Sequence, residues 1–251
     1  MESISDPPPP YPESPISNTP EQETLPPTTL ILSNKSIHTE TAPSTPLYQV
    51  SQDISSLPQK FTSVKFERLE TSAPIKIENK STEPQKKHIF YLAHPAHAQY
   101  RKDVPAYYIT SVSPGSLGNI RFQMSKSRFQ KMEFRALLSP GKTMGDKPLF
   151  SEDAETVLFS AKMKWTGGWY RWTDARGMEV AFEGGKGERS KLVITASMNQ
   201  DMNDALIALW VLRMCGMAAA HGVWKNGFRP REDVGSVGSS WCTWRWRLIA
   251  N

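Results

Sequence analysis

The chain has 251 residues, a formal net charge of +5, 38% hydrophobic residues and two cysteines. This length allows one or two domains, and two cysteines exclude a small scaffold stapled by disulfides. The N-terminus carries no apolar run typical of a secretory signal. We therefore expect a cytoplasmic protein, peripheral at membranes if it binds lipid.

The charge is distributed unevenly. Residues 1–50 contain 11 prolines, one lysine, no arginine and six acidic residues, which gives a net charge of −5. Residues 88–251 contain 22 basic and 14 acidic residues, which gives +8. A basic body suits phosphate-rich partners, although a surplus of solvated lysines gives the same count.

Residues 1–60 are predicted to be a disordered, acidic tail, because Pro, Ser and Thr dominate and large apolar side chains are sparse. The tail includes Pro8, Pro9 and Tyr11, which match the P-P-x-Y ligand of WW domains. Consecutive prolines favour the polyproline II helix that such domains accept. The motif predicts a WW-domain partner, and an inert flexible tail is the alternative.

Residues 61–87 are predicted to be a transition into the folded domain. Phe61–Leu69 alternates between apolar and polar residues, as a half-buried strand does, and Ile75–Ile77 could form another short strand. The ordered domain then spans 88–251, and its first half reads as a series of strands separated by turn signals. These predicted strands are Ile89–Leu92, Tyr107–Val112, Asn119–Met124, Lys131–Leu138, Thr156–Trp165, Trp169–Thr173, Met178–Phe182 and Lys191–Ala196.

A helix is predicted at about 200–221, with Asn199 or Asp201 as its N-cap. Its apolar residues point in every direction, which is typical of a buried helix or a membrane span, and a partner-binding helix is the third possibility. The stretch from Ala205 to Ala220 is roughly 24 Å long and has Arg213 near its middle, which disfavours a span. We expect no transmembrane segment and a helix enclosed by the strands, with five side chains mostly buried: Leu209, Trp210, Leu212, Met214 and Met217.

Arg213 is the exception on this helix, since an enclosed lone charge is too costly to leave unpaired. We expect it to reach a carboxylate or backbone carbonyls, or to extend to one mouth of the barrel. Farther on, Trp241–Leu248 reads as a last barrel strand, as a Trp- and Arg-rich segment for a lipid interface, or as an irregular chain end.

Several of these segments together resemble a known family. They are the Trp-Tyr-Arg-Trp-Thr-Asp stretch at 169–174, the Gly-x-x-Val-Ala pattern at 177–181, the strand Leu192–Thr195 and the apolar helix. Over residues 88–221 the chain resembles the tubby C-terminal-like fold, in particular its LURP-one-related and fungal uncharacterised branch. The resemblance implies a closed antiparallel β-barrel around a hydrophobic helix, and phosphoinositide binding as in the tubby members.

The resemblance has two departures and transfers no binding residue. About thirty residues follow the helix here, whereas the family helix lies at or near the C-terminus. Only eight or nine strands are predicted, so closure of the barrel could need Phe61–Leu69, Ile75–Ile77 or Trp241–Leu248. The lipid-binding lysines and arginines of tubby proteins match no positions in this chain.

No motif of a hydrolase, a nucleotide-binding loop, a dinucleotide site or a zinc protease occurs in the sequence. We therefore expect no enzyme activity, no cofactor and no metal. The remaining chemical feature is a basic cluster between Gln99 and Arg135, with seven basic and two acidic residues. The candidate lipid-binding residues within it are Arg121, Lys126, Arg128, Lys131 and Arg135.

Two functions are consistent with these observations. The first is a non-enzymatic β-barrel module whose basic face binds anionic phospholipid, with phosphoinositide as the expected lipid. The alternative is an adaptor that recruits WW-domain partners through its tail. A solvated surface also explains the basic cluster, and nucleic acid is disfavoured because no recognised nucleic-acid motif is present.

Overall fold

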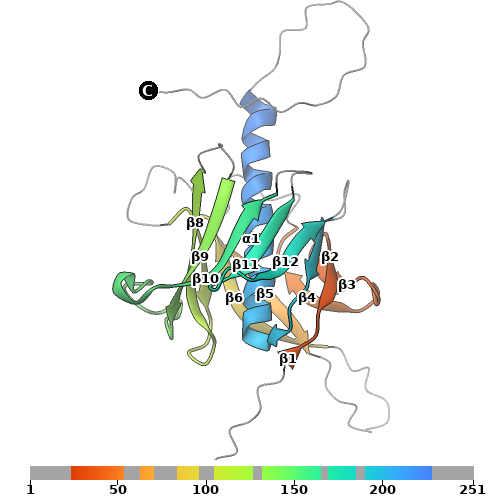
Figure 1. Ribbon diagram of the computed structural model, residues 1–251, viewed down its shortest axis with the longest axis horizontal. Helices are drawn as coiled ribbons and strands as arrows, with labels where there is room; N and C mark the ends of the chain where they lie inside the picture. The colour runs from red at the N-terminus through yellow and green to blue at the C-terminus, as the bar shows by residue number, and fades with distance from the viewer. Residues whose placement is uncertain are drawn as a thin grey trace, which may run out of the picture.

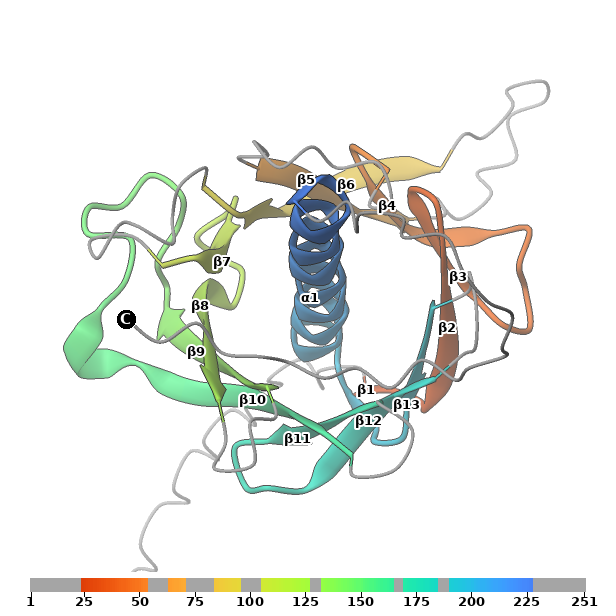
Figure 2. The same cartoon turned by 90° about the horizontal axis from the view of Figure 1, so that it is seen from above.

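Antiparallel strands close into a barrel, and one long helix passes through its centre (Figures 1 and 2). The computed structural model describes residues 24–53, 63–70, 84–95, 105–126, 132–164, 169–184 and 190–227. Within these ranges the ring contains twelve strands in the order β10-β11-β12-β13-β2-β3-β4-β5-β6-β7-β8-β9.

The strands of the first half are β1 (Thr24–Leu25), β2 (Thr28–Ser33), β3 (Ser36–Thr39), β4 (Pro46–Val50), β5 (Ser63–Glu70), β6 (Gln85–Ala93) and β7 (Tyr107–Ser111). The second half has β8 (Gly118–Lys126), β9 (Met132–Pro140), β10 (Thr156–Met163), β11 (Tyr170–Asp174), β12 (Glu179–Gly184), β13 (Ser190–Ile194) and β14 (Met198–Asn199). A 3₁₀ turn, η3 (Glu152–Ala154), precedes β10, and the helix is α1 (Gln200–Gly227). The mostly β fold class and the enclosed helix predicted from the sequence are confirmed.

The predicted strands from Ile89 to Ala196 are confirmed as β6 to β13, and Phe61–Leu69 is confirmed as β5. Alternation identified them correctly because one face of each strand is buried and the other is exposed. Ile75–Ile77 and Trp241–Leu248 lie outside the described residues, and the ring closes without either of them.

The prediction of disorder over residues 1–60 is wrong for residues 24–53. This segment forms β1 to β4, and β2 closes the ring by pairing with β13, with Leu30 opposite Leu192. The composition of the whole tail hides these strands, because prolines dilute short alternating runs whose apolar members are buried: Leu30, Leu32, Ile37 and Val50. The barrel therefore begins before residue 61, at Thr28, while Pro8, Pro9 and Tyr11 lie outside the described residues.

The helix fills the barrel as predicted. The side chain of Asn199 accepts a hydrogen bond from the backbone N–H of Met202 at 2.9 Å and caps the helix. Every residue from Ala205 to Leu212 is fully buried, and Met214 is half-buried. The side chain of Met217 lies outside the described residues, so its predicted burial stays a prediction.

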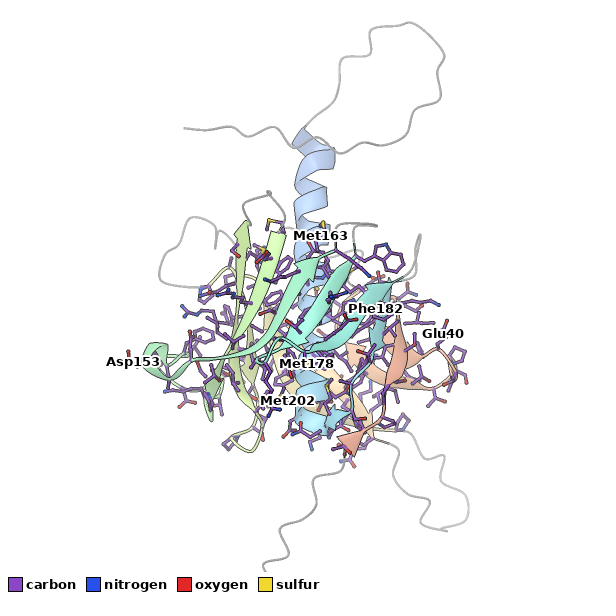
Figure 3. The ribbon with its side chains drawn as sticks, in the orientation of Figure 1. Glu40, Asp153, Met163, Met178, Phe182 and Met202 are labelled. Carbon is purple, nitrogen blue, oxygen red and sulfur yellow. The ribbon has the colours of Figure 1, made fainter. Side chains whose placement is uncertain are left out.

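Two barrel ends follow from this arrangement. The entry end is the end of the barrel where α1 begins, and Met178, between β11 and β12, lies at that end (Figure 3). The exit end is the end where α1 leaves the ring, and Met163 of β10 lies at that end. Among the described residues, no helix has the length and hydropathy required to cross a membrane.

Arg213 lies inside the barrel and pairs with Glu183 of β12. Its Nε donates to Glu183 Oε1 at 2.6 Å, and its Nη2 donates to Glu183 Oε2. The indole N–H of Trp172 donates to the same carboxylate at 3.0 Å, and the guanidinium lies 4.3 Å from the ring centroid of Tyr170. The expectation that Arg213 reaches a carboxylate is confirmed. Burial raises the pKa of the Glu183 carboxyl, and the nearby Arg213 and Trp172 oppose this increase.

Removing one member of this pair should be far more damaging than removing both charges. Arg213→Met leaves the Glu183 carboxylate buried and unpaired, and we expect a loss of about 3–5 kcal/mol in the free energy of unfolding. Glu183→Gln in the same chain keeps an acceptor for Trp172 and should restore most of that loss. Urea denaturation of the four proteins of this cycle measures both effects. An Arg213→Met protein as stable as the wild type would contradict the account.

Candidate functional site

The basic cluster predicted from the sequence is only partly present among the described residues. Arg121 of β8 donates to Glu155, whose side chain is 6% exposed, so its charge is neutralised within the fold. Arg135 of β9 is exposed, and it forms no ion pair with another described residue. Lys126 ends β8, but its side chain is not described, and Arg128 and Lys131 lie outside the described residues. Arg135 is therefore the member of the cluster that the structure leaves available.

A second group of cations lies on the same outer wall, over β10 and β11. The strand register places Glu133, Lys162, Arg171 and Phe182 side by side across β9 to β12. These side chains face outward, because their neighbours Ala161 and Trp172 are fully buried inside the barrel. Lys162 lies 3.7 Å from Glu133, which is a weak ion pair at an exposed surface.

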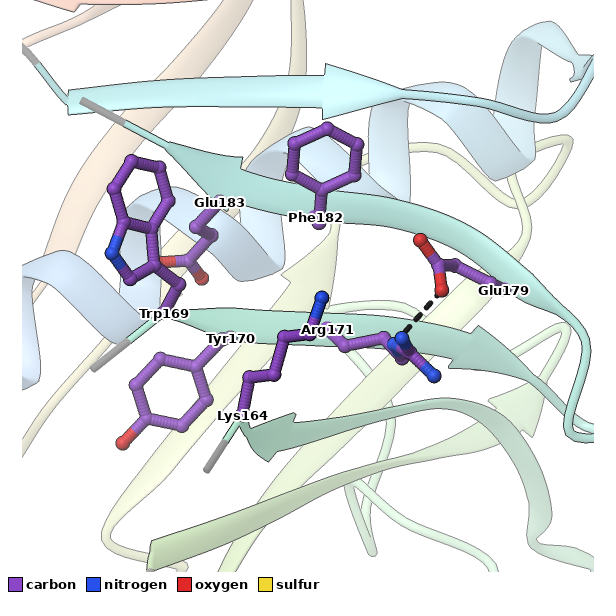
Figure 4. Close-up of a pocket in the computed structure, with 7 residues that line it drawn as sticks. All are labelled: Lys164, Trp169, Tyr170, Arg171, Glu179, Phe182 and Glu183. Atoms are coloured by element: carbon purple, nitrogen blue, oxygen red, sulfur yellow. Dashed lines mark ion pairs between the residues drawn. The ribbon is translucent and has the colours of Figure 1, made fainter. Parts of the chain in front are cut away.

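A recess lies in this wall near the exit end (Figure 4). Its lining residues come from the end of β10, from β11 and from β12: Lys164, Trp169, Tyr170, Arg171, Glu179, Phe182 and Glu183. The recess lies where β10 and β11 are connected. The backbone N–H of Lys164 donates to the carbonyl of Trp169 at 2.7 Å, which closes the base of the β10–β11 connection.

Gly184 leaves the space that the Trp169 ring occupies. A Cβ at position 184 would stand 2.8 Å from Cζ3 of Trp169, so any larger residue would displace the indole. The ring is half-buried, and Phe182 on the opposite side of the recess is 38% exposed. Together they give the recess two aromatic walls.

The charges in the recess do not cancel. Arg171 pairs with Glu179, with 2.8 Å between Nε and Oε2, as the dashed line in Figure 4 marks. Glu183 is neutralised from inside the barrel by Arg213. Lys164 is exposed and forms no ion pair within the part of the chain that the structure describes. The recess therefore offers one ammonium group together with two aromatic surfaces, which suits an anionic group carried on an apolar body.

Reasoning from the sequence missed this site, although one signal was present. The stretch Trp169–Thr173 was recognised as a strand, and its alternation places Trp169 and Arg171 on the face opposite Tyr170 and Trp172. Its relation to Phe182 and Lys164 depends on the register of three strands, which a sequence alone does not fix.

A second polar cluster joins the start of α1 to the wall, near the entry end. Asp204 accepts hydrogen bonds from Tyr48 at 2.8 Å, from Arg68 at 2.5 Å and from Gln200 at 2.7 Å. Asn203 also donates to the hydroxyl of Tyr48 at 3.1 Å. Asp204 is 1% exposed, so these groups satisfy one another and do not face a substrate. We interpret the cluster as the fastening of α1 to β4 and β5.

Other reactive groups are similarly enclosed. Burial raises the pKa of the Cys215 thiol to about 12, which makes it a poor nucleophile at neutral pH. No cluster of three or more His, Cys, Asp or Glu side chains suited to a metal ion occurs within the described ranges.

The buried Asp204 should make stability depend on pH. Burial raises its pKa from 3.8 to about 6, against the opposing effects of Tyr48, Arg68 and Gln200. Between these two values the folded state binds more protons than the unfolded state, so stability falls as pH rises from about 4 to 6 and then levels off. The fall amounts to at most about 3 kcal/mol.

Asp204→Asn isolates this contribution. Urea denaturation from pH 4 to 8 measures the unfolding free energy of the wild type minus that of the variant. This difference should decrease as pH rises from 4 to 6. Both proteins retain Glu183, so its contribution cancels in this difference. A difference that is constant over this range would show that Asp204 is ionised throughout.

Comparisons of the chain with protein-family models, with curated proteins and with solved structures gave no match. The function is therefore argued from the geometry of the recess and the charges around it.

Proposed function

We propose that the chain is a non-enzymatic β-barrel module that binds anionic membrane phospholipid, including phosphoinositide, through the outer wall formed by β9 to β12. The observation that carries the proposal is the recess, which the exposed Lys164 lines together with the aromatic rings of Trp169 and Phe182. Arg135 adds a second exposed cation on the same wall.

The chemistry of these side chains suits a lipid headgroup. Each lysine or arginine near an anionic bilayer contributes about 1 kcal/mol of binding free energy. Tryptophan is favoured at the boundary between headgroups and acyl chains, because its ring is amphipathic. A cation beside two partly exposed rings can therefore contact a phosphate and the apolar region below it together.

The resemblance to the tubby-like fold supports the same function. That family implies a closed barrel around a hydrophobic helix, and this chain has such a barrel with α1 inside it. Membership of the family is part of the proposal, as is a cytoplasmic location with peripheral attachment to membranes. The proposal assigns no catalytic role, and the carboxylates of Glu183 and Asp204 already serve in structural pairs.

Vesicle sedimentation tests the proposal. The full chain should pellet with phosphatidylcholine vesicles that contain phosphoinositide and stay in solution with phosphatidylcholine alone. Lys164→Ala combined with Arg135→Ala should weaken binding roughly 10- to 30-fold, since two cations are lost. Arg176→Ala is the matched control, because Arg176 is exposed in the turn at the entry end.

Equal pelleting with both kinds of vesicle, or with neither, would refute lipid-headgroup recognition. If Arg176→Ala loses about half as much binding free energy as the double variant, only net charge matters and not this wall, since it removes one cation instead of two. Retention on RNA or DNA of comparable charge, without binding to vesicles, would favour nucleic acid instead.

The second candidate function is recruitment of a WW-domain protein, and it rests on the Pro8-Pro9-Pro10-Tyr11 motif. These residues lie outside the described ranges, so this candidate rests on the sequence motif and on the polyproline II preference of such segments. Pull-down with isolated WW domains should retain the wild-type chain and lose the Tyr11→Ala variant. Unchanged retention of Tyr11→Ala would remove this candidate.

A further inference from the structure

Three neighbouring strands, β8 to β10, each carry a methionine at the exit end of the barrel. Met124 of β8 pairs with Phe134, and Met163 of β10 pairs with Tyr170, and both partners are buried inside the barrel. Residues directly opposite in a ladder share a face, so both methionines lie on the inner face of the wall. Met132 of β9 lies two residues before Phe134 and shares that face. With Met214 of α1 these residues form what we call the methionine mouth: Met124, Met132, Met163 and Met214.

The mouth is only partly covered. Met132, Met163 and Met214 are half-buried and pack against the core, whereas Met124 is 43% exposed. Figure 3 shows Met163 at the end of the barrel where the helix leaves. Methionine side chains are flexible and polarizable, and they adapt to irregular apolar partners.

The helix continues beyond this mouth. Cys215 is buried, and α1 runs on for twelve residues to Gly227, which is about 18 Å of helix. Figure 1 shows this part extending beyond the ring of strands. Between Gly216 and Gly227 the sequence contains no acidic residue and one lysine, Lys225.

Exposed cations lie at the same end of the barrel. Lys164 follows β10, and Lys35 lies in the β2–β3 turn, which the antiparallel order also places at the exit end. The carboxylates of Glu133 and Glu183 on the neighbouring strand ends are paired with Lys162 and Arg213. Asp53, which follows β4 at the same end, is half-buried. Among the described residues, the exposed cation directly after Met163 is therefore Lys164, beside an apolar centre.

We propose that the methionine mouth is the surface that enters the interface of an anionic bilayer, so that the barrel stands with its exit end on the membrane and α1 projecting into the headgroup region. This inference rests on the proposed function and adds to it an orientation and an apolar contribution. An apolar patch bordered by lysines is the arrangement that interfacial binding requires. A protein partner with an apolar surface fits the methionines equally, but the exposed Lys164 favours anionic lipid.

Spin labels at two exposed methionines test the orientation. Met124→Cys places a label at the exit end, and Met178→Cys places one at the entry end, where Met178 is 65% exposed. Both are made in a Cys242→Ser chain, and Cys215 stays buried at 3% exposure. On vesicles of phosphatidylcholine and phosphatidylserine, the label at 124 should gain collisions with oxygen and lose collisions with an aqueous nickel chelate. The label at 178 should be unchanged.

A neutral substitution separates the apolar contribution from charge. Met124→Gln should weaken vesicle binding about fivefold, since it removes part of the apolar area without adding charge. Met178→Gln should bind within about twofold of the wild type. Thermal unfolding of both variants confirms that the barrel is intact.

The outcomes separate the two proposals. If the wild type fails to bind any anionic vesicle, the proposed function fails and this inference fails with it. If binding persists while both labels stay in water, or while the label at 178 is the one immersed, the function stands and the orientation is wrong. Immobilisation of the label at 124 that grows with protein concentration in the absence of lipid would assign the mouth to a second copy of the chain and overturn the inference.

Discussion

The structure depends on one constraint, which is that a ring of twelve strands encloses more space than its own side chains can fill. Smaller barrels are filled by inward side chains alone, whereas larger ones need a plug or hold water. Here α1 is the plug, and it can serve only if every side is apolar. That requirement explains why Ala205 to Leu212 lack a polar face and why no residue of that stretch is exposed. The strands and the helix are therefore stable only together.

Arg213 is the exception to the apolar surface of α1, and it connects the interior of the barrel with the outer wall. Arg213 is held by Glu183 and Tyr170, and both of these residues also line the recess on the other side of the same strands. The pair fixes β11 and β12 against the helix close to the exit end. The rigid placement of Trp169 and Phe182 thus depends on a charge pair inside the barrel, so the buried Arg213 belongs to the support of the candidate site.

The sequence revealed those features that have a local periodicity. Alternation located β5 and the eight strands from β6 to β13, and the unbroken apolar run located α1. The same run showed that an enclosed Arg213 needs a polar partner or a way out to one mouth. Composition failed for β1 to β4, since its average hides six-residue runs such as Thr28–Ser33. The site depends on distant partners. Arg121 was predicted as a ligand because its neutralising partner Glu155 lies thirty-four residues farther along the chain, and the sequence does not show that pairing. Lys164 and Phe182 line one recess only through the register of three strands.

The two barrel ends differ in a way that follows from the course of the helix. At the entry end, Asp204 is bonded to Tyr48 and Arg68, and the small β1–β14 sheet joins the segment before β2 to the start of α1. At the exit end no such polar fastening of α1 is found beyond Arg213 among the described side chains, and the methionines of α1 and of β8 to β10 lie there instead. Polar bonds lock one end in a single arrangement, whereas methionine contacts tolerate repacking. A surface that must adapt to lipid is better built at the second end, because changes there leave the anchored start of the helix unaffected.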